Sequence, residues 1–95
     1  MLREATGVVL VVEHDVLRRH ATATQLRRGG LEVFEAADAT EAKMILERMA
    51  VDVLLSDVNL VDGEPLAQWV KEHDLPTRVC WLVSESDSQE RRLHS

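Results

Sequence analysis

Polar side chains directly follow three apolar runs in this 95-residue sequence, and their types suit a defined chemistry. They are Glu13, His14 and Asp15 after the first run, Asp57 after the second and Ser84 after the third. Two carboxylates that lie close together repel each other, and a hard cation with oxygen ligands, such as Mg²⁺, relieves the repulsion. A carboxylate beside such an ion can act as a nucleophile toward a phosphoryl group, because the metal neutralises charge on the transferring oxygens. These residues form one pocket only if the fold brings the ends of the runs together.

The apolar runs have the composition of strands in a parallel sheet. Val8 to Val12 is apolar on both faces, which indicates a central strand covered by helices on each side. Val51 to Ser56 and Val79 to Val83 are further buried strands, whereas the charged, alternating segment from Leu31 to Ala36 fits an edge strand. Ligands bind beyond the carboxyl ends of parallel strands, where the strand order reverses. If the first and third strands are neighbours, the carboxylates that follow them lie close together.

Three helix-compatible stretches separate these strands and give the order βαβαβαβ, with right-handed crossovers. The first runs from Val16 to Arg28 and stops at a pair of glycines, the second follows a cap at Asp38 or Thr40, and the third is opened by Pro65. One side of the first helix carries Leu17, Ala21, Thr24 and Arg28.

Length and composition narrow the classes of function. We expect one domain over residues 1–95, with a core at 7–84 and a polar tail or partial helix at 85–95. With 11 basic against 17 acidic residues and a net charge of −6, the chain lacks the basic face that binds nucleic acid, and its arginine pairs are expected on solvated helix faces.

Cys80 is the single cysteine, which excludes an intrachain disulfide and fits the reducing cytoplasm. The apolar runs are too short to cross a membrane and no secretory signal precedes them, so we expect a cytoplasmic chain without a membrane partner.

The order and spacing of these residues resemble the receiver domain of two-component response regulators. Three segments carry the resemblance, each at the end of the matching strand: Val8 to Asp15, Val53 to Gly63 and Leu82 to Ser84. The resemblance covers residues 7 to 84 and implies a flavodoxin-like three-layer α/β sandwich with a parallel sheet in the order 2-1-3-4. It also implies a switch in phosphorelay signalling rather than an enzyme.

The resemblance gives each polar residue of the pocket a role. Asp57 is the expected phosphoacceptor, and a histidine kinase or a phosphotransfer protein is the expected donor of the phosphoryl group. Mg²⁺ is expected on Glu13, Asp57 and the backbone carbonyl of Asn59. Ser84 is expected to hydrogen-bond the phosphoryl group and to report its presence to a downstream protein partner.

Two departures from the family pattern bear on this chemistry. His14 replaces one of the usual acidic metal ligands, and a neutral imidazole is a poor Mg²⁺ ligand, so we expect weak binding of this ion or its replacement by a softer metal. We favour a solvated loop histidine over a transition-metal ligand, because no second histidine lies in the motif. The lysine that follows the family's fifth strand has no counterpart, since the only lysines are Lys43 and Lys71 on predicted helices.

The sequence also lacks the family's usual fifth strand and last helix. The strand at 79–83 would then lie at an edge of the sheet, with Trp81 and no charge inside it. We therefore expect a homodimer, an exchange of segments between chains, or a longer parent protein.

Two other functions stay open on the residues alone. A degenerate receiver would act as a protein-interaction or dimerisation module without phosphate chemistry, and His14 and the missing lysine favour it. A metal-dependent phosphatase or hydrolase with Asp57 as nucleophile is weaker, because Asn59 stands where such enzymes commonly carry a second general acid. Asp15 is interpreted as the N-cap of the first helix and Cys80 as an inert packing residue.

Overall fold

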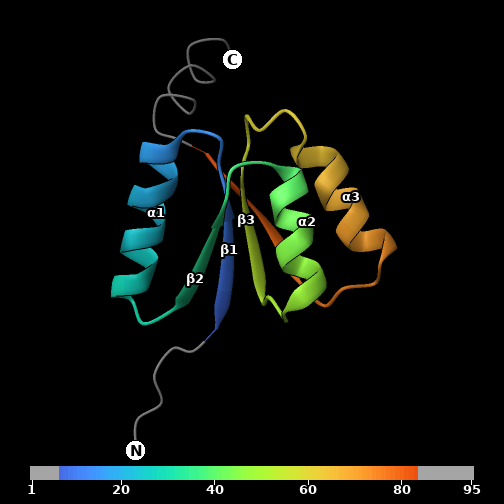
Figure 1. Cartoon of the computed structure of the whole chain (residues 1–95), viewed down its shortest axis with the longest axis horizontal. Coiled ribbons are helices and arrows are strands. Elements are labelled where there is room, and N and C mark those ends of the chain that lie inside the picture. The colour runs from blue at the N-terminus through green and yellow to red at the C-terminus, as the bar shows by residue number, and fades with distance from the viewer. Residues whose placement is uncertain (1–6, 84–95) are drawn as a thin grey trace, which may run out of the picture.

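The computed structural model describes residues 7–83, in which four strands alternate with three helices (Figure 1). The strands are β1 (Val8–Val12), β2 (Glu32–Ala36), β3 (Val53–Asp57) and β4 (Arg78–Leu82). The helices are α1 (Val16–Arg28), α2 (Ala39–Arg48) and α3 (Gly63–Glu72). The predicted order of elements is confirmed for this part of the chain.

The four strands are parallel and lie in the order β2-β1-β3-β4, which confirms the predicted order 2-1-3-4. β1 is paired on both sides, with Val12 opposite Ala36 of β2 and opposite Ser56 of β3. Because the strands run in one direction, the carboxyl ends of β1 and β3 meet at the same end of the sheet. The strand order reverses between these two strands, which is where parallel α/β sheets bind ligands.

Helices cover both faces of the sheet, with α1 on one face and α2 and α3 on the other (Figure 1). β1 supplies both cores, because successive side chains of a strand point to opposite faces. Leu10 and Val12 pack on the side of α2 and α3, whereas Val9 and Val11 pack on the side of Ala23 from α1. Leu10, Val11 and Val12 have no exposed surface, and each such burial is worth roughly 1.5–3 kcal/mol. The apolar run therefore holds β1 at the centre of the domain.

Helix α1 packs on the sheet with a different side from the one that carries Leu17. Leu17 is 78% exposed, and Ala21 and Arg28 are exposed as well. Ala23 is completely buried and Leu26 is half-buried against the sheet. The side of α1 that covers the sheet is therefore the one with Ala23 and Leu26, not the one with Leu17.

Some boundaries differ from the sequence-based expectation. Val51 is buried but precedes β3, which instead extends to include Asp57. Helix α3 begins at Gly63 rather than at Pro65. β4 begins at Arg78 and is exposed or half-buried rather than buried, because within residues 7–83 it pairs with β3 alone. No helix in this described range is long and apolar enough to cross a membrane.

Candidate functional site

Two buried carboxylates lie at the carboxyl ends of β1 and β3. Glu13 follows Val12, Asp57 follows Ser56, and Val12 and Ser56 are direct partners in the sheet. Neighbouring strands lie about 4.8 Å apart, so this register brings the two acidic residues to adjacent positions, as expected from the sequence. Glu13 is 4% exposed and Asp57 is 6% exposed. Burial of two neighbouring carboxylates is unfavourable unless a positive charge or a hydrogen-bond donor compensates them.

Asp57 lines two pockets. The larger pocket, of about 430 Å³, also contains His14 and Asn59. The smaller pocket, of about 270 Å³, also contains Glu13 and Arg18. Asp57 thus borders both pockets, although its residue as a whole is only 6% exposed. A ligand in either pocket would therefore lie beside Asp57.

The carboxylate of Glu13 is held by its own loop and by the first turn of α1. Its Oε2 accepts a hydrogen bond from the Asp15 N–H at 2.8 Å, and its Oε1 lies 4.0 Å from Nη1 of Arg18. The backbone carbonyl of Glu13 accepts a hydrogen bond from Nη1 of Arg19 at 3.0 Å. Glu13 is therefore fixed beside Asp57. Arg19 binds its main chain, and Arg18 lies near its side chain.

His14 is exposed and lines the larger pocket together with Asp57 and Asn59. In the part of the chain that the structure describes, no three His, Cys, Asp or Glu side chains gather closely enough to hold a metal ion by themselves. Ser84, the predicted phosphoryl contact, lies outside the described residues.

Asp15 caps the N-terminus of α1, as the sequence predicts. Its Oδ1 accepts hydrogen bonds from the N–H groups of Leu17 at 2.9 Å and Arg18 at 3.1 Å. The bond from the Arg18 N–H is the main cause that lowers the pKa of Asp15 below its ordinary value of 3.8, because it favours the ionised form. The cap satisfies free amides at the start of the helix and fixes the direction in which α1 leaves the site.

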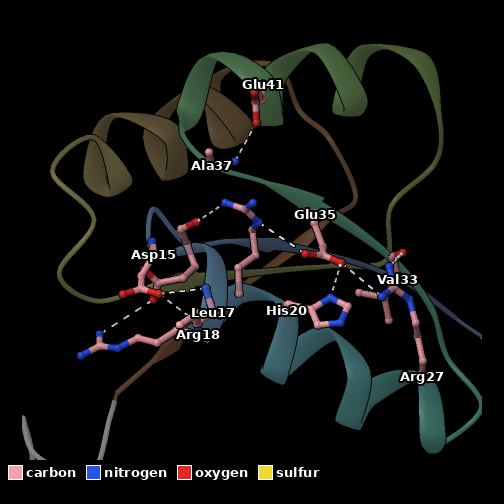
Figure 2. Close-up of polar contacts among 11 residues, drawn as sticks. Asp15, Leu17, Arg18, His20, Arg27, Val33, Glu35, Ala37 and Glu41 are labelled. Atoms are coloured by element: carbon pink, nitrogen blue, oxygen red, sulfur yellow. Dashed lines mark hydrogen bonds and ion pairs between the residues drawn. The ribbon is translucent and has the colours of Figure 1, made fainter.

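A second cap lies on the other side of the site, at the start of α2. Asp38, rather than Thr40, accepts the hydrogen bond from the Glu41 N–H, at 2.9 Å. The carboxylate of Glu41 in turn accepts the N–H of Ala37 at 2.7 Å (Figure 2). Asp62 of the β3–α3 loop accepts the N–H of Ala39 at 3.1 Å, a contact that the sequence did not signal. The loop after β3 is thereby joined to the start of α2.

Glu35 of β2 gathers three basic side chains from α1 (Figure 2). Its carboxylate lies 3.1 Å from Nη1 of Arg27, 3.4 Å from Nε of Arg19 and 3.8 Å from Nδ1 of His20. Arg27 also donates to the carbonyl of Val33 at 2.8 Å. The side chain of Arg19 is only 17% exposed, so the expectation of a solvated face is wrong for Arg19. The reason is that β2 presents a carboxylate to this face of α1.

The fold and the site together define an α/β domain of the flavodoxin-like type, with acidic residues where its strand order reverses. Residues 9–94 match the family model of the response regulator receiver domain. The chain belongs to this family, which carries the signals of two-component systems.

Known proteins with a similar sequence or structure agree with this assignment. The chain is 30% identical over 87 residues to the sensor histidine kinase RcsC of Salmonella typhimurium. The aligned region is 90% of this chain and 9% of RcsC. The chain is 38% identical over 88 residues to the transcriptional regulatory protein CutR of Streptomyces coelicolor. Here the aligned region is 87% of this chain and 39% of CutR. The chemotaxis response regulator CheY4 of Vibrio cholerae has the same fold, with a TM-score of 0.73 and 25% identity over 93% of this chain and 77% of CheY4. The chain thus spans less than half of the length of both curated relatives.

Proposed function

We propose that this receiver domain accepts a phosphoryl group on Asp57 from a histidine kinase or a phosphotransfer protein. The observation that carries the proposal is the position of Asp57, which ends β3, is 6% exposed and lines both pockets at the switch point of the sheet. The similarity to a segment of RcsC, which is a sensor histidine kinase, supports a phosphohistidine as the donor.

The proposed step is the transfer of one phosphoryl group between two side chains. An Oδ atom of Asp57 attacks the phosphorus of the phosphohistidine, a P–O bond forms, and the P–N bond breaks with its electron pair on the imidazole nitrogen. The reaction leaves an acyl phosphate on Asp57 and a free histidine on the donor. The step replaces one negative charge at Asp57 by approximately two, beside the carboxylate of Glu13.

The residues of the site fit Mg²⁺ as a largely hydrated ion. Mg²⁺ keeps several waters and needs one or two carboxylates, and Glu13 and Asp57 are two buried carboxylates at adjacent positions. These two side chains and the backbone carbonyl of Asn59 would hold the ion, while His14 brings no carboxylate. When bound, Mg²⁺ supplies neutralisation of charge on the transferring oxygens. Because one acidic ligand is missing, we expect weak binding.

The output of the domain is proposed to pass through other proteins rather than through catalysis. Ser84 is proposed to hydrogen-bond the phosphoryl group, and a downstream partner to read the changed surface around it. A homodimer is a further candidate, because β4 exposes Trp81 and within residues 7–83 pairs with β3 only. We place the domain in the cytoplasm, where the free thiol of Cys80 stays reduced.

A second candidate function is that of an interaction module that works without phosphate. It is favoured by His14, and by the finding that no three potential metal-ligating side chains gather within residues 7–83. A phosphatase with Asp57 as nucleophile would differ from both candidates by repeated turnover of a phosphate ester.

Incubation with acetyl phosphate, with and without Mg²⁺, separates these functions. The proposal predicts a Mg²⁺-dependent gain in intact mass of one phosphoryl group per chain, with acetate as the leaving group. A folded chain that gains no mass would support the interaction module. Continuous release of inorganic phosphate over many turnovers would support the phosphatase.

A further inference from the structure

The smaller pocket beside Asp57 carries a cation and a hydroxyl group on one side of α1. It has a volume of about 270 Å³ and is lined by Glu13, Arg18, Ala21, Thr22, Asp57 and Leu82. Arg18 and Thr22 are four residues apart, so they lie one above the other on the same side of the helix. Their side chains therefore face the same space as the carboxylate of Asp57.

Arg18 is only loosely engaged. Its Nη1 lies 4.0 Å from Oε1 of Glu13, which is the limit of an ion pair, and its side chain is 52% exposed. The carboxylate of Glu13 is 5% exposed and already accepts the N–H of Asp15 at 2.8 Å. The guanidinium is thus close to the buried acidic pair without being locked onto it, and a short movement of a flexible side chain would bring it to a new partner.

Among residues 7–83, Arg18 is also the one arginine or lysine that lines either of the two pockets containing Asp57. Lys43 and Lys71 lie on α2 and α3, on the opposite face of the sheet from α1. Arg19 is engaged with Glu35 and with the carbonyl of Glu13. A positive charge for the smaller pocket therefore comes from Arg18.

A phosphoryl group on Asp57 needs such a charge. It would place about two negative charges beside Glu13 in a partly buried site, where an uncompensated charge is costly. A guanidinium donates two parallel hydrogen bonds to phosphate oxygens, which makes it a strong partner for this group.

We propose that Arg18 binds the phosphoryl oxygens on Asp57 from the α1 side, with the hydroxyl of Thr22 as a second donor. The inference deepens the proposed function and rests on it. Arg18 would exchange its 4.0 Å contact with Glu13 for direct hydrogen bonds to the phosphoryl group. It would then speed the formation of the acyl phosphate.

The test compares Arg18→Ala and Arg18→Lys with Arg28→Ala, which removes an exposed arginine at the far end of the same helix. Each variant is incubated with acetyl phosphate over a range of Mg²⁺ concentrations, and the rate of mass gain is measured. Removal of one charged hydrogen-bond donor corresponds to roughly a 10- to 100-fold loss in rate for Arg18→Ala. Arg18→Lys keeps the charge but not the paired hydrogen bonds, so it should recover part of the rate, and Arg28→Ala should match the wild type.

The Mg²⁺ series distinguishes direct binding from an effect on the metal. The proposal requires that the deficit of Arg18→Ala persist at saturating Mg²⁺, and that Thr22→Val show a smaller loss of a few-fold. The proposal is wrong if the deficit vanishes at high Mg²⁺, if Arg18→Lys is as slow as Arg18→Ala, or if Arg18→Ala equals the wild type. In those three cases the wild type still gains a phosphoryl group and the proposed function stands. A wild type that gains none overturns both.

Discussion

Glu13 and Asp57 each stand one residue beyond a directly paired couple, Val12 of β1 and Ser56 of β3. The main-chain pairing of the sheet, rather than any bond between the two side chains, therefore brings two buried carboxylates together. The repulsion between the two carboxylates destabilises the folded state, whereas in the unfolded chain the two groups are far apart. A substitution of one carboxylate should leave the backbone of the site in place.

Asp57→Asn should accordingly stabilise the folded domain in the absence of Mg²⁺. The change removes one of two buried neighbouring charges and keeps the shape of the side chain, so we expect a gain of about 1–2 kcal/mol in the free energy of unfolding at neutral pH. Urea denaturation of both proteins in a chelating buffer measures this gain. A loss of stability would show that the carboxylate of Asp57 is compensated within the folded chain.

The cap of α1 should make stability depend on acidic pH. The hydrogen bond from the Arg18 N–H lowers the pKa of Asp15 below 3.8, so its ionised form stabilises the folded state. This contribution is fully present above the unfolded-state value near 3.8 and is lost as the pH falls through the lower folded-state pKa. Asp15→Ala should lower the melting temperature at neutral pH, and the difference from the wild type should shrink in strong acid. A difference that is the same at all pH values would argue against an ionised cap.

Glu35→Gln should destabilise the domain by about 1–3 kcal/mol, because it removes the charge that Arg19 and Arg27 share across α1 and β2. Glu32→Gln is a matched control, since Glu32 is an exposed glutamate on the same strand. Urea denaturation measures both. Equal stability of the two variants would show that the Glu35 cluster adds nothing to the docking of α1.

Within residues 7–83, β4 pairs with β3 alone, and we expect its other side to promote self-association. Trp81 is 40% exposed and Val83 is 37% exposed at this edge of the described sheet. We expect a concentration-dependent dimer in light scattering, and Val83→Lys should weaken it, because a lysine at a strand edge opposes pairing with another strand. Met44→Lys, at an exposed position on α2, should leave it unchanged. A strictly monomeric wild type at high concentration would contradict this expectation.

The features that could be predicted from the sequence are those that depend on local pattern. β1 was predicted with its bounds because its five residues are apolar on both faces, and the cap at Asp15 because a carboxylate precedes the helix by one residue. The proximity of Glu13 and Asp57 followed from one assumption about strand order.

The remaining features depend on how α1 is rotated on the sheet, which its sequence leaves open. Leu17 is a large apolar residue near its start and yet faces solvent, while the small Ala23 is buried. The same rotation directs Arg19 toward Glu35 and Arg18 toward the pocket of Asp57, so neither role could be assigned before the helix was placed.

The most direct test of the central claim is the position of the phosphoryl group. Wild type, Asp57→Asn and Asp74→Asn are incubated with acetyl phosphate and Mg²⁺, and the intact mass of each is measured. Asp74 is an exposed aspartate with a positive φ of 55°, a conformation that asparagine also tolerates, so this variant controls for loss of a carboxylate elsewhere. We predict one added phosphoryl group on the wild type and on Asp74→Asn, and none on Asp57→Asn. A phosphoryl group on Asp57→Asn, or none on a folded wild type, would contradict the account.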